Sequence, residues 1–250
     1  MEPSRLLECL AGDYARLRLV AARDLTAEVP SCPGWTVSDL VHHVAEVYLH
    51  KTECMRQQVS PEPWPPAELA LEEPIPLLER AYAALTAQFA ARAPGDVSPT
   101  WHQANRTVGF WIRRMAQETV IHRIDAELAL GEPVAAIPAD LAVDGIDEVL
   151  TLFVGHGSHA WAEDFGPTLA AAIGYRIRVR TEGRSWAVTT SAGGAEITAD
   201  GADPVDATIA GDPASVLRWL WARGAEDAVT VEGEHKAVTE LRAFLAAATL

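Results

Sequence analysis

A glutamate and a histidine four residues apart, Glu118 and His122, have the spacing needed to hold a metal ion together. In a helix, residues at i and i+4 project from one face. The neighbouring Ile112, Met115 and Ile121 indicate that this helix has a buried side. An inward-facing glutamate and histidine need partners, and a divalent metal ion satisfies both. Many such pairs are exposed or only hydrogen-bonded, so the spacing alone leaves both interpretations open.

A second stretch of the chain offers further ligands at His42, His43, Glu46 and His50. In a helix expected over residues 37–56, His43 lies beside the apolar Leu40 and Val44, whereas His42 points more outward. Two histidines and a glutamate leave one coordination position open, as catalytic zinc sites do, and they also suit iron or nickel. A solvent-facing His42 beside a hydrogen-bonded core His43 is the alternative.

Long amphipathic helices are expected to position these side chains. Apolar residues recur at three- and four-residue steps in four segments, over residues 4–22, 37–56, 76–93 and 108–130. Thr36 and Asp39 have the spacing of a capping box ahead of the second segment. The proline-rich segment 60–68 is predicted to be a loop. Four helices with apolar stripes favour a four-helix bundle.

The hydrophobic period changes in the last third of the chain. Tyr175, Ile177 and Val179 alternate with arginines, which is the period of a half-buried strand. A meander of further strands is expected at Trp186 and Val188, at Ile197, at Ala207 and Ile209, and over 228–231, with helices over 213–221 and 235–247. The prediction is therefore a helical domain over 1–155, with a fifth helix at 138–154, and a small α+β domain over 168–250.

Composition excludes several classes of function. The 35 acidic and 20 basic residues give a formal charge of −15, which repels nucleic acid and anionic lipid. The charged N-terminus has no signal-peptide core, and no apolar run is long enough to span a membrane. Three widely spaced cysteines, Cys9, Cys32 and Cys54, indicate reduced thiols in a cytoplasmic protein.

Common catalytic motifs do not offer another explanation. The sequence has no HExxH, no GxSxG, no Walker loop and no GxGxxG that opens a helix. This argues against zincin-type proteolysis and against the common hydrolase, NTPase and Rossmann functions.

Two separated segments carry a family resemblance. CPGWTVSDLVHHV (residues 32–44) and RMAQETVIHRIDA (residues 114–126) resemble the two motifs of the mycothiol-dependent maleylpyruvate isomerase family. The resemblance covers essentially the whole chain. It implies a DinB-like four-helix bundle followed by a smaller sterol-carrier-like α+β domain. It also implies zinc on His43, Glu118 and His122, and mycothiol as the second cofactor.

The resemblance carries over unevenly at other positions. His42 occupies a position that is commonly small in the family, and Gln117 stands where relatives often have histidine. Trp221-Ala222-Arg223 resembles a Trp-Gly-Arg segment, which makes Arg223 a candidate for handling the substrate, although Ala222 replaces the glycine. A surface arginine that caps a helix is the alternative for Arg223.

Charged residues around the second motif are assigned structural roles. Arg113 and Arg114 are expected on a solvated helix face, with contact to a carboxylate as the alternative. Arg123 and Asp125 are expected to form an ion pair, or Asp125 orients a metal-ligating histidine.

The function that the resemblance implies is activation of a thiol on zinc for addition to an electrophilic small molecule. Cis-trans isomerisation of a maleylpyruvate-like 2-oxoacid is the first expectation. A mycothiol S-transferase and a non-catalytic, metal-stabilised small-molecule binding protein are the alternatives. The expected partners are the thiol and the electrophile, without nucleic acid or membrane, in a monomer or homodimer.

Overall fold

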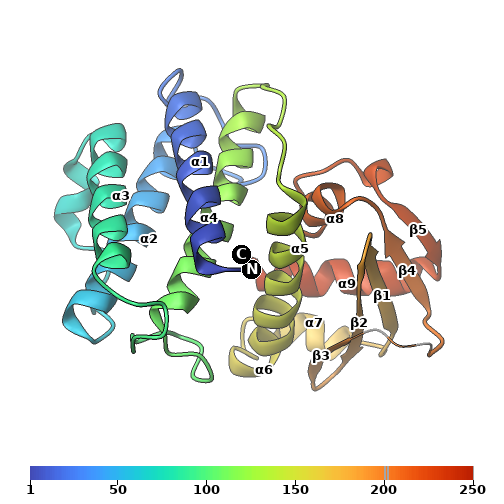
Figure 1. The fold of residues 1–250 in the computed structure, drawn as a ribbon. Coiled ribbons are helices and arrows are strands. Elements are labelled where there is room, and N and C mark those ends of the chain that lie inside the picture. Colours follow the sequence, from blue (N-terminus) through green and yellow to red (C-terminus); the bar gives the residue numbers. More distant parts are fainter. Residues whose placement is uncertain (200, 202, 250) are drawn as a thin grey trace. The chain divides into compact units, whose positions relative to one another are not determined.

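The computed structural model describes residues 1–199, 201 and 203–249. The chain divides into two compact units, Met1–Ala135 and Ala136–Leu250. The first is helical, and the second combines helices with one sheet (Figure 1). This confirms the fold class of helical bundle followed by a small α+β domain.

The first unit is the expected four-helix bundle. Its helices are α1 (Pro3–Ala21), α2 (Val37–Gln57), α3 (Pro74–Ala90) and α4 (Val108–Ala129), with a 3-10 turn η1 (Ala67–Leu71) between α2 and α3. Helix α4 packs against α1 and α2, and α2 also packs against α3. The start of α2 is fixed by the predicted capping box, in which Thr36 and Asp39 bond each other's backbone N–H. Thr107 caps α4 by accepting a hydrogen bond from the Phe110 N–H.

The predicted fifth helix belongs with the second unit and not with the bundle. It consists of α5 (Ala139–Glu148) followed by the π-helical η2 (Val149–His156), and α6 (Gly157–Ala160) and α7 (Gly166–Ala171) follow. The apolar face of α5, which includes Leu141 and Ile146, is buried where α5 packs on a helix of the second unit. The division therefore falls before α5, earlier than the boundary between 155 and 168 expected from the sequence.

The second unit contains a five-stranded sheet in the order β3-β2-β1-β4-β5. Its strands are β1 (Arg176–Thr181), β2 (Arg184–Ser191), β3 (Gly194–Ala199), β4 (Ala207–Ala210) and β5 (Thr230–Gly233). Helices α8 (Pro213–Leu220) and α9 (His235–Ala248) and the short η3 (Glu226–Ala228) complete it. The expected meander is wrong at one step, because β4 pairs in parallel with β1 and not with β3. The fully buried Ile177 and Val179 explain the central place of β1.

Among the residues that the structure describes, no helix combines the length and the apolar character needed to cross a bilayer.

Candidate metal centre

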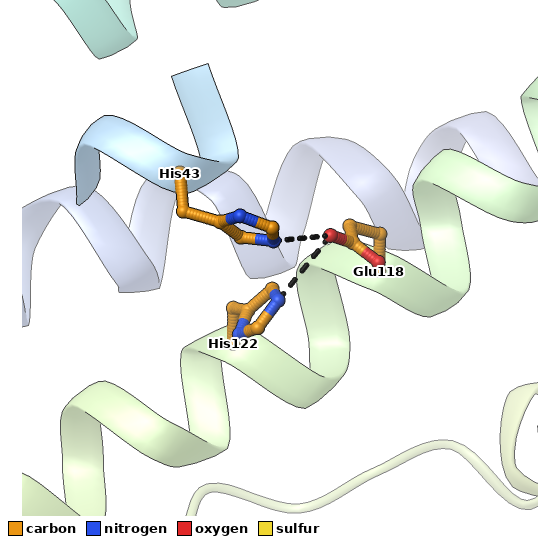
Figure 2. A group of neighbouring side chains, drawn as sticks. All are labelled: His43, Glu118 and His122. Carbon is orange, nitrogen blue, oxygen red and sulfur yellow. Dashed lines mark hydrogen bonds and ion pairs between the residues drawn. The ribbon is translucent and has the colours of Figure 1, made fainter. Parts of the chain in front are cut away.

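The three predicted ligands come together between two helices of the first unit. His43 projects from α2 toward Glu118 and His122 on α4 (Figure 2). The Nε2 atoms of His43 and His122 each lie 3.2 Å from Glu118 Oε1. One turn along, Tyr48 of α2 and Thr119 of α4 share a hydrogen bond of 2.5 Å, which fixes the two helices beside the site.

The geometry of the three atoms fits a divalent metal ion. One ligand atom from each residue lies within 4.8 Å of the others. Ligands at 2.0–2.1 Å in a tetrahedral zinc site lie roughly 3.3 Å from one another, close to the two distances of 3.2 Å from Glu118 Oε1. Nitrogen, nitrogen and oxygen donors are the set that catalytic zinc takes, with a fourth position left open.

Neighbouring side chains orient both ligands on α4. His122 Nδ1 donates to Asp125 Oδ2 at 2.9 Å, which leaves Nε2 directed at Glu118. Arg114 Nη2 donates to Glu118 Oε2 at 2.7 Å, which leaves Oε1 for the site. Of the two roles considered for Asp125, the orienting role is therefore the one that the geometry supports.

Arg114 corrects one of the sequence predictions. It was expected on a solvated face, but only 4% of it is exposed, and the alternative of a carboxylate partner is what the structure shows. Helix α4 is enclosed on most sides, so several of its charged residues are buried, whereas Arg113 is half-buried. Arg114 precedes Glu118 by four residues, and this spacing was the signal available in the sequence.

The loop ahead of α2 joins the two sequence motifs. The Ser31 hydroxyl donates to Asp125 Oδ1, and Cys32 Sγ lies 4.0 Å from Asp125 Oδ2. Asp125 is fully buried between the loop and His122. The first motif therefore contributes one candidate ligand, His43, and also part of the surroundings of a second candidate, His122.

At this site, burial and the neighbouring charged groups shift the pKa values of Glu118 and His122 in opposite directions. Burial alone would raise the pKa of Glu118, but His122, His43 and Arg114 together hold it well below its usual range. Burial alone would lower the pKa of His122, but Glu118 and Asp125 raise it to about 9. In the metal-free protein the pair is therefore a carboxylate and an imidazolium.

The metal-free protein is expected to lose stability as the pH rises from 6.5 to 8. His122 binds its proton more tightly folded, with a pKa of about 9, than unfolded at 6.5. The stabilisation that protonated His122 contributes is therefore complete below pH 6.5 and is lost as the pH rises through 9. Over this window the free energy of unfolding should fall by up to about 2 kcal/mol. Lys51, whose pKa burial lowers to about 8, acts in the opposite sense only above that pH.

Urea unfolding of the metal-free protein at several pH values measures this slope. His122→Gln should flatten it, because the titrating group is gone. A wild-type free energy that stays level or rises between pH 6.5 and 8 would contradict the assignment. Zinc affinity should rise over the same window, because the metal competes with the proton on His122.

Asp125→Asn is expected to weaken zinc binding by roughly 10- to 100-fold. The amide keeps the shape of the carboxylate but not its charge, so His122 loses basicity and fixed orientation. Competition with a chromophoric chelator measures the affinity. Asp227→Asn, at an exposed position of the second unit, is the matched control. An unchanged affinity in Asp125→Asn would show that Asp125 has no influence on His122.

Arg123 corrects a second prediction. It pairs with Asp13 of α1 at 3.0 Å and with Glu127 at 2.7 Å, and donates to the Ala135 carbonyl. Residues two apart on a helix face different directions, so Arg123 is turned toward α1 while Asp125 is turned toward the metal ligands. Arg16 of α1 also bonds Glu127, at 2.8 Å, which completes a buried ionic cluster.

Three other candidates, all on helix α2, lie outside the predicted ligand set. His42 and Glu46 line a groove on α2 together with His43. His50 faces a different cavity, where its Nδ1 lies 3.1 Å from Lys51 Nζ and 3.5 Å from Cys54 Sγ.

Arg223 belongs to the second unit, directly after α8. Its Nη1 donates to the Trp221 carbonyl at 2.6 Å, and its guanidinium lies 5.7 Å from the centre of the Trp221 ring. Ala222, which replaces the glycine of the family segment, has a φ of +56°. The position is therefore one that glycine would favour, in agreement with the family pattern.

Family models match both units of the chain. The model of the mycothiol maleylpyruvate isomerase N-terminal domain matches residues 8–127, and the model of the corresponding C-terminal domain matches residues 140–240. The chain belongs to the mycothiol-dependent maleylpyruvate isomerase family. This is a family of enzymes, and its two-domain pattern coincides with the two units of the structure.

Two solved structures of the isomerase have the same fold. A crystal structure of the mycothiol-dependent maleylpyruvate isomerase has a TM-score of 0.65 and 16% identity, and the match covers 94% of this chain and 95% of that one. A histidine-to-alanine mutant of the mycothiol-dependent maleylpyruvate isomerase gives the same values. A ubiquinone synthesis protein matches 46% of this chain with a TM-score of 0.29 and 19% identity. No curated protein matches.

Proposed function

We propose that this protein is a zinc- and mycothiol-dependent isomerase that converts a cis 2-oxoacid resembling maleylpyruvate into its trans isomer. The observation that carries the proposal is the set His43, Glu118 and His122, which has zinc-ligand geometry. Membership of the family supports mycothiol as the cofactor and isomerisation as the reaction class.

A divalent cation bound by these residues would lower the pKa of a thiol, which is near 8.5 when free, and supply a nucleophile at neutral pH. The protein's own groups prepare the site for the cation. Asp125 holds His122 with Nε2 inward, and Arg114 holds Glu118 with Oε1 inward. Because both supporting residues are buried, the ligands need little rearrangement on binding.

The isomerisation needs no net change in atoms or electrons. Bound mycothiol would supply a nucleophilic sulfur whose reversible addition to the cis double bond would allow rotation, and its elimination would return the thiol unchanged. We propose that Arg223 binds a carboxylate of the substrate, since a guanidinium can hold it by two parallel hydrogen bonds.

The test is incubation of zinc-loaded protein with mycothiol and maleylpyruvate, with both the oxoacid and the thiol quantified by NMR. Trans product with the thiol recovered in full supports the isomerase. A stable thioether product would instead show that the protein is a mycothiol S-transferase. Neither product, from protein that contains one zinc per chain, would overturn the proposed function in favour of a binding protein.

A further inference from the structure

A second cavity lies in the first unit, between the last turns of helix α2 and the segment that leads into α4. Its volume is about 140 Å³, and a cavity of roughly 150 Å³ holds a molecule the size of benzene. The side chains of Pro99, Trp101 and Trp111 make its walls largely apolar. His50, which also lines it, follows His43 by two helical turns, or roughly 10 Å along the axis. The cavity shares no residue with the metal ligands.

Lys51 brings an amine to the wall of this cavity. It is one of only two lysines among the 20 basic residues of the chain. Its Nζ lies 3.1 Å from His50 Nδ1 and 4.9 Å from the centre of the Trp111 ring, and both of these side chains line the cavity. Within the part of the chain that the structure describes, no carboxylate forms an ion pair with this nitrogen. The amine therefore lacks the counter-ion that a cation in a protein interior usually has.

The surroundings make the Lys51 nitrogen a nucleophile. Burial lowers its pKa to about 8, so at neutral pH it carries roughly two hundred times more free amine than an ordinary lysine. Burial and the charge of Lys51 lower the pKa of His50 to about 4, so the imidazole is neutral and Nδ1 can accept a proton. Cys54 Sγ lies 3.5 Å from the same Nδ1, but burial raises the pKa of this thiol. A desolvated amine in an apolar pocket is the group that forms Schiff bases with carbonyl compounds.

Size and charge restrict the carbonyl compound that this cavity can hold. The volume admits about six heavy atoms, the number in benzene. The apolar walls disfavour a carboxylate, which would lose its hydration there, and the formal charge of −15 on the chain repels anions in general. An uncharged aldehyde of four or five carbons satisfies both conditions.

We propose that Lys51 forms an imine with short, uncharged aldehydes held in this cavity. This activity goes beyond the proposed isomerisation and requires neither metal nor mycothiol. The amine nitrogen bonds to the carbonyl carbon, and the π electron pair of the carbonyl moves onto its oxygen. Both N–H protons end on that oxygen, the first by way of His50, and water leaves as the C=N bond forms. Hydrolysis reverses the step, and no oxidant or reductant is consumed.

The test is labelling of the full-length protein with butanal and sodium cyanoborohydride at neutral pH, because hydride converts an imine into a stable N-butyl amine. Peptide mapping by mass spectrometry separates Lys51 from Lys236, which is exposed on α9, and from the N-terminal amine. Lys51 should be labelled at least about tenfold faster than Lys236. Its rate should saturate with butanal and fall when butan-1-ol, which fits the cavity but has no carbonyl group, is added. Lys236 should show neither effect.

Two variants identify the groups involved. His50→Gln should slow the labelling of Lys51 at least about tenfold, because a positioned proton-transfer group contributes roughly 10²- to 10⁴-fold. His159→Gln, at an exposed position of α6, is the matched control and should label like the wild type. Lys51→Arg keeps a cation beside Trp111 and should confine the label to Lys236 and the N-terminus.

Equal labelling rates at Lys51 and Lys236 in the wild type would overturn the proposal. Labelling of Lys51 that neither saturates nor responds to butan-1-ol would also overturn it, because the aldehyde would then react from bulk solvent. A wild-type rate in His50→Gln would contradict the role given to His50. None of these readouts depends on isomerase activity, so the proposal can fail or stand independently of the proposed function.

Discussion

His122→Ala should abolish stoichiometric zinc binding and reduce thiol-dependent turnover roughly 1,000-fold. Two of the three ligands lie on α4, and this change leaves only Glu118 there to act with His43. A bound metal contributes several kcal/mol of charge stabilisation, and each 1.36 kcal/mol is a factor of ten in rate. Mass spectrometry of metal content, on protein purified without added metal, gives the stoichiometry.

His235→Ala, an exposed histidine at the start of α9, is the matched control and should keep about one zinc per chain. His43→Ala should behave like His122→Ala, because each removes one donor from the same set. Retention of one tightly bound zinc in either variant would show that the metal lies elsewhere. Well-folded wild-type protein that takes up no added zinc would contradict the metal centre as a whole.

Arg123→Met should lower the free energy of unfolding of the first unit by about 3–5 kcal/mol. Only 1% of Arg123 is exposed, and its side chain neutralises Glu127, which is fully buried, and Asp13. Methionine keeps most of the volume but leaves the buried Asp13 without its cation and the buried Glu127 with Arg16 alone. Urea unfolding followed by far-ultraviolet circular dichroism measures the change.

The comparison variant is Arg5→Met, which removes an exposed ion pair with Glu8 and should cost less than about 1 kcal/mol. The triple change Arg123→Met, Asp13→Leu and Glu127→Leu should recover much of the loss, because no buried charge is then left without a partner. A loss below about 1 kcal/mol in Arg123→Met would show that water reaches the cluster and compensates the charges.

The sequence was sufficient to predict the bundle, and the three candidate ligands that it indicated lie close together in the structure. Apolar stripes identified each helix of the first unit to within a few residues, and Thr36 marked the start of α2. His43 was distinguished from His42 by its place beside Leu40 and Val44, both of which are fully buried. These features depend on local periodicity, which a single sequence displays.

The errors arose where tertiary packing decides the outcome. Arg114 and Arg123 have the charge of surface residues, and only the enclosure of α4 on most sides makes them buried partners of carboxylates. The parallel pairing of β1 with β4 joins segments that are not neighbours in the chain, so no local pattern reveals it. Likewise, α5 follows the bundle in sequence but packs on α8.

The ligand set also has a topological consequence, because His43 and Glu118 are 75 residues apart in the chain. A metal bound to both would close the intervening segment into a ring, in the way a disulfide does, but reversibly. By the chain-entropy estimate for a covalent bridge, a closure of that length restricts the unfolded chain by roughly 4 kcal/mol. After a single backbone cut in the segment 58–73, such an ion would link the two fragments in addition to the packing of α1 and α2 on α3 and α4. A chelator would remove only the link through the ion.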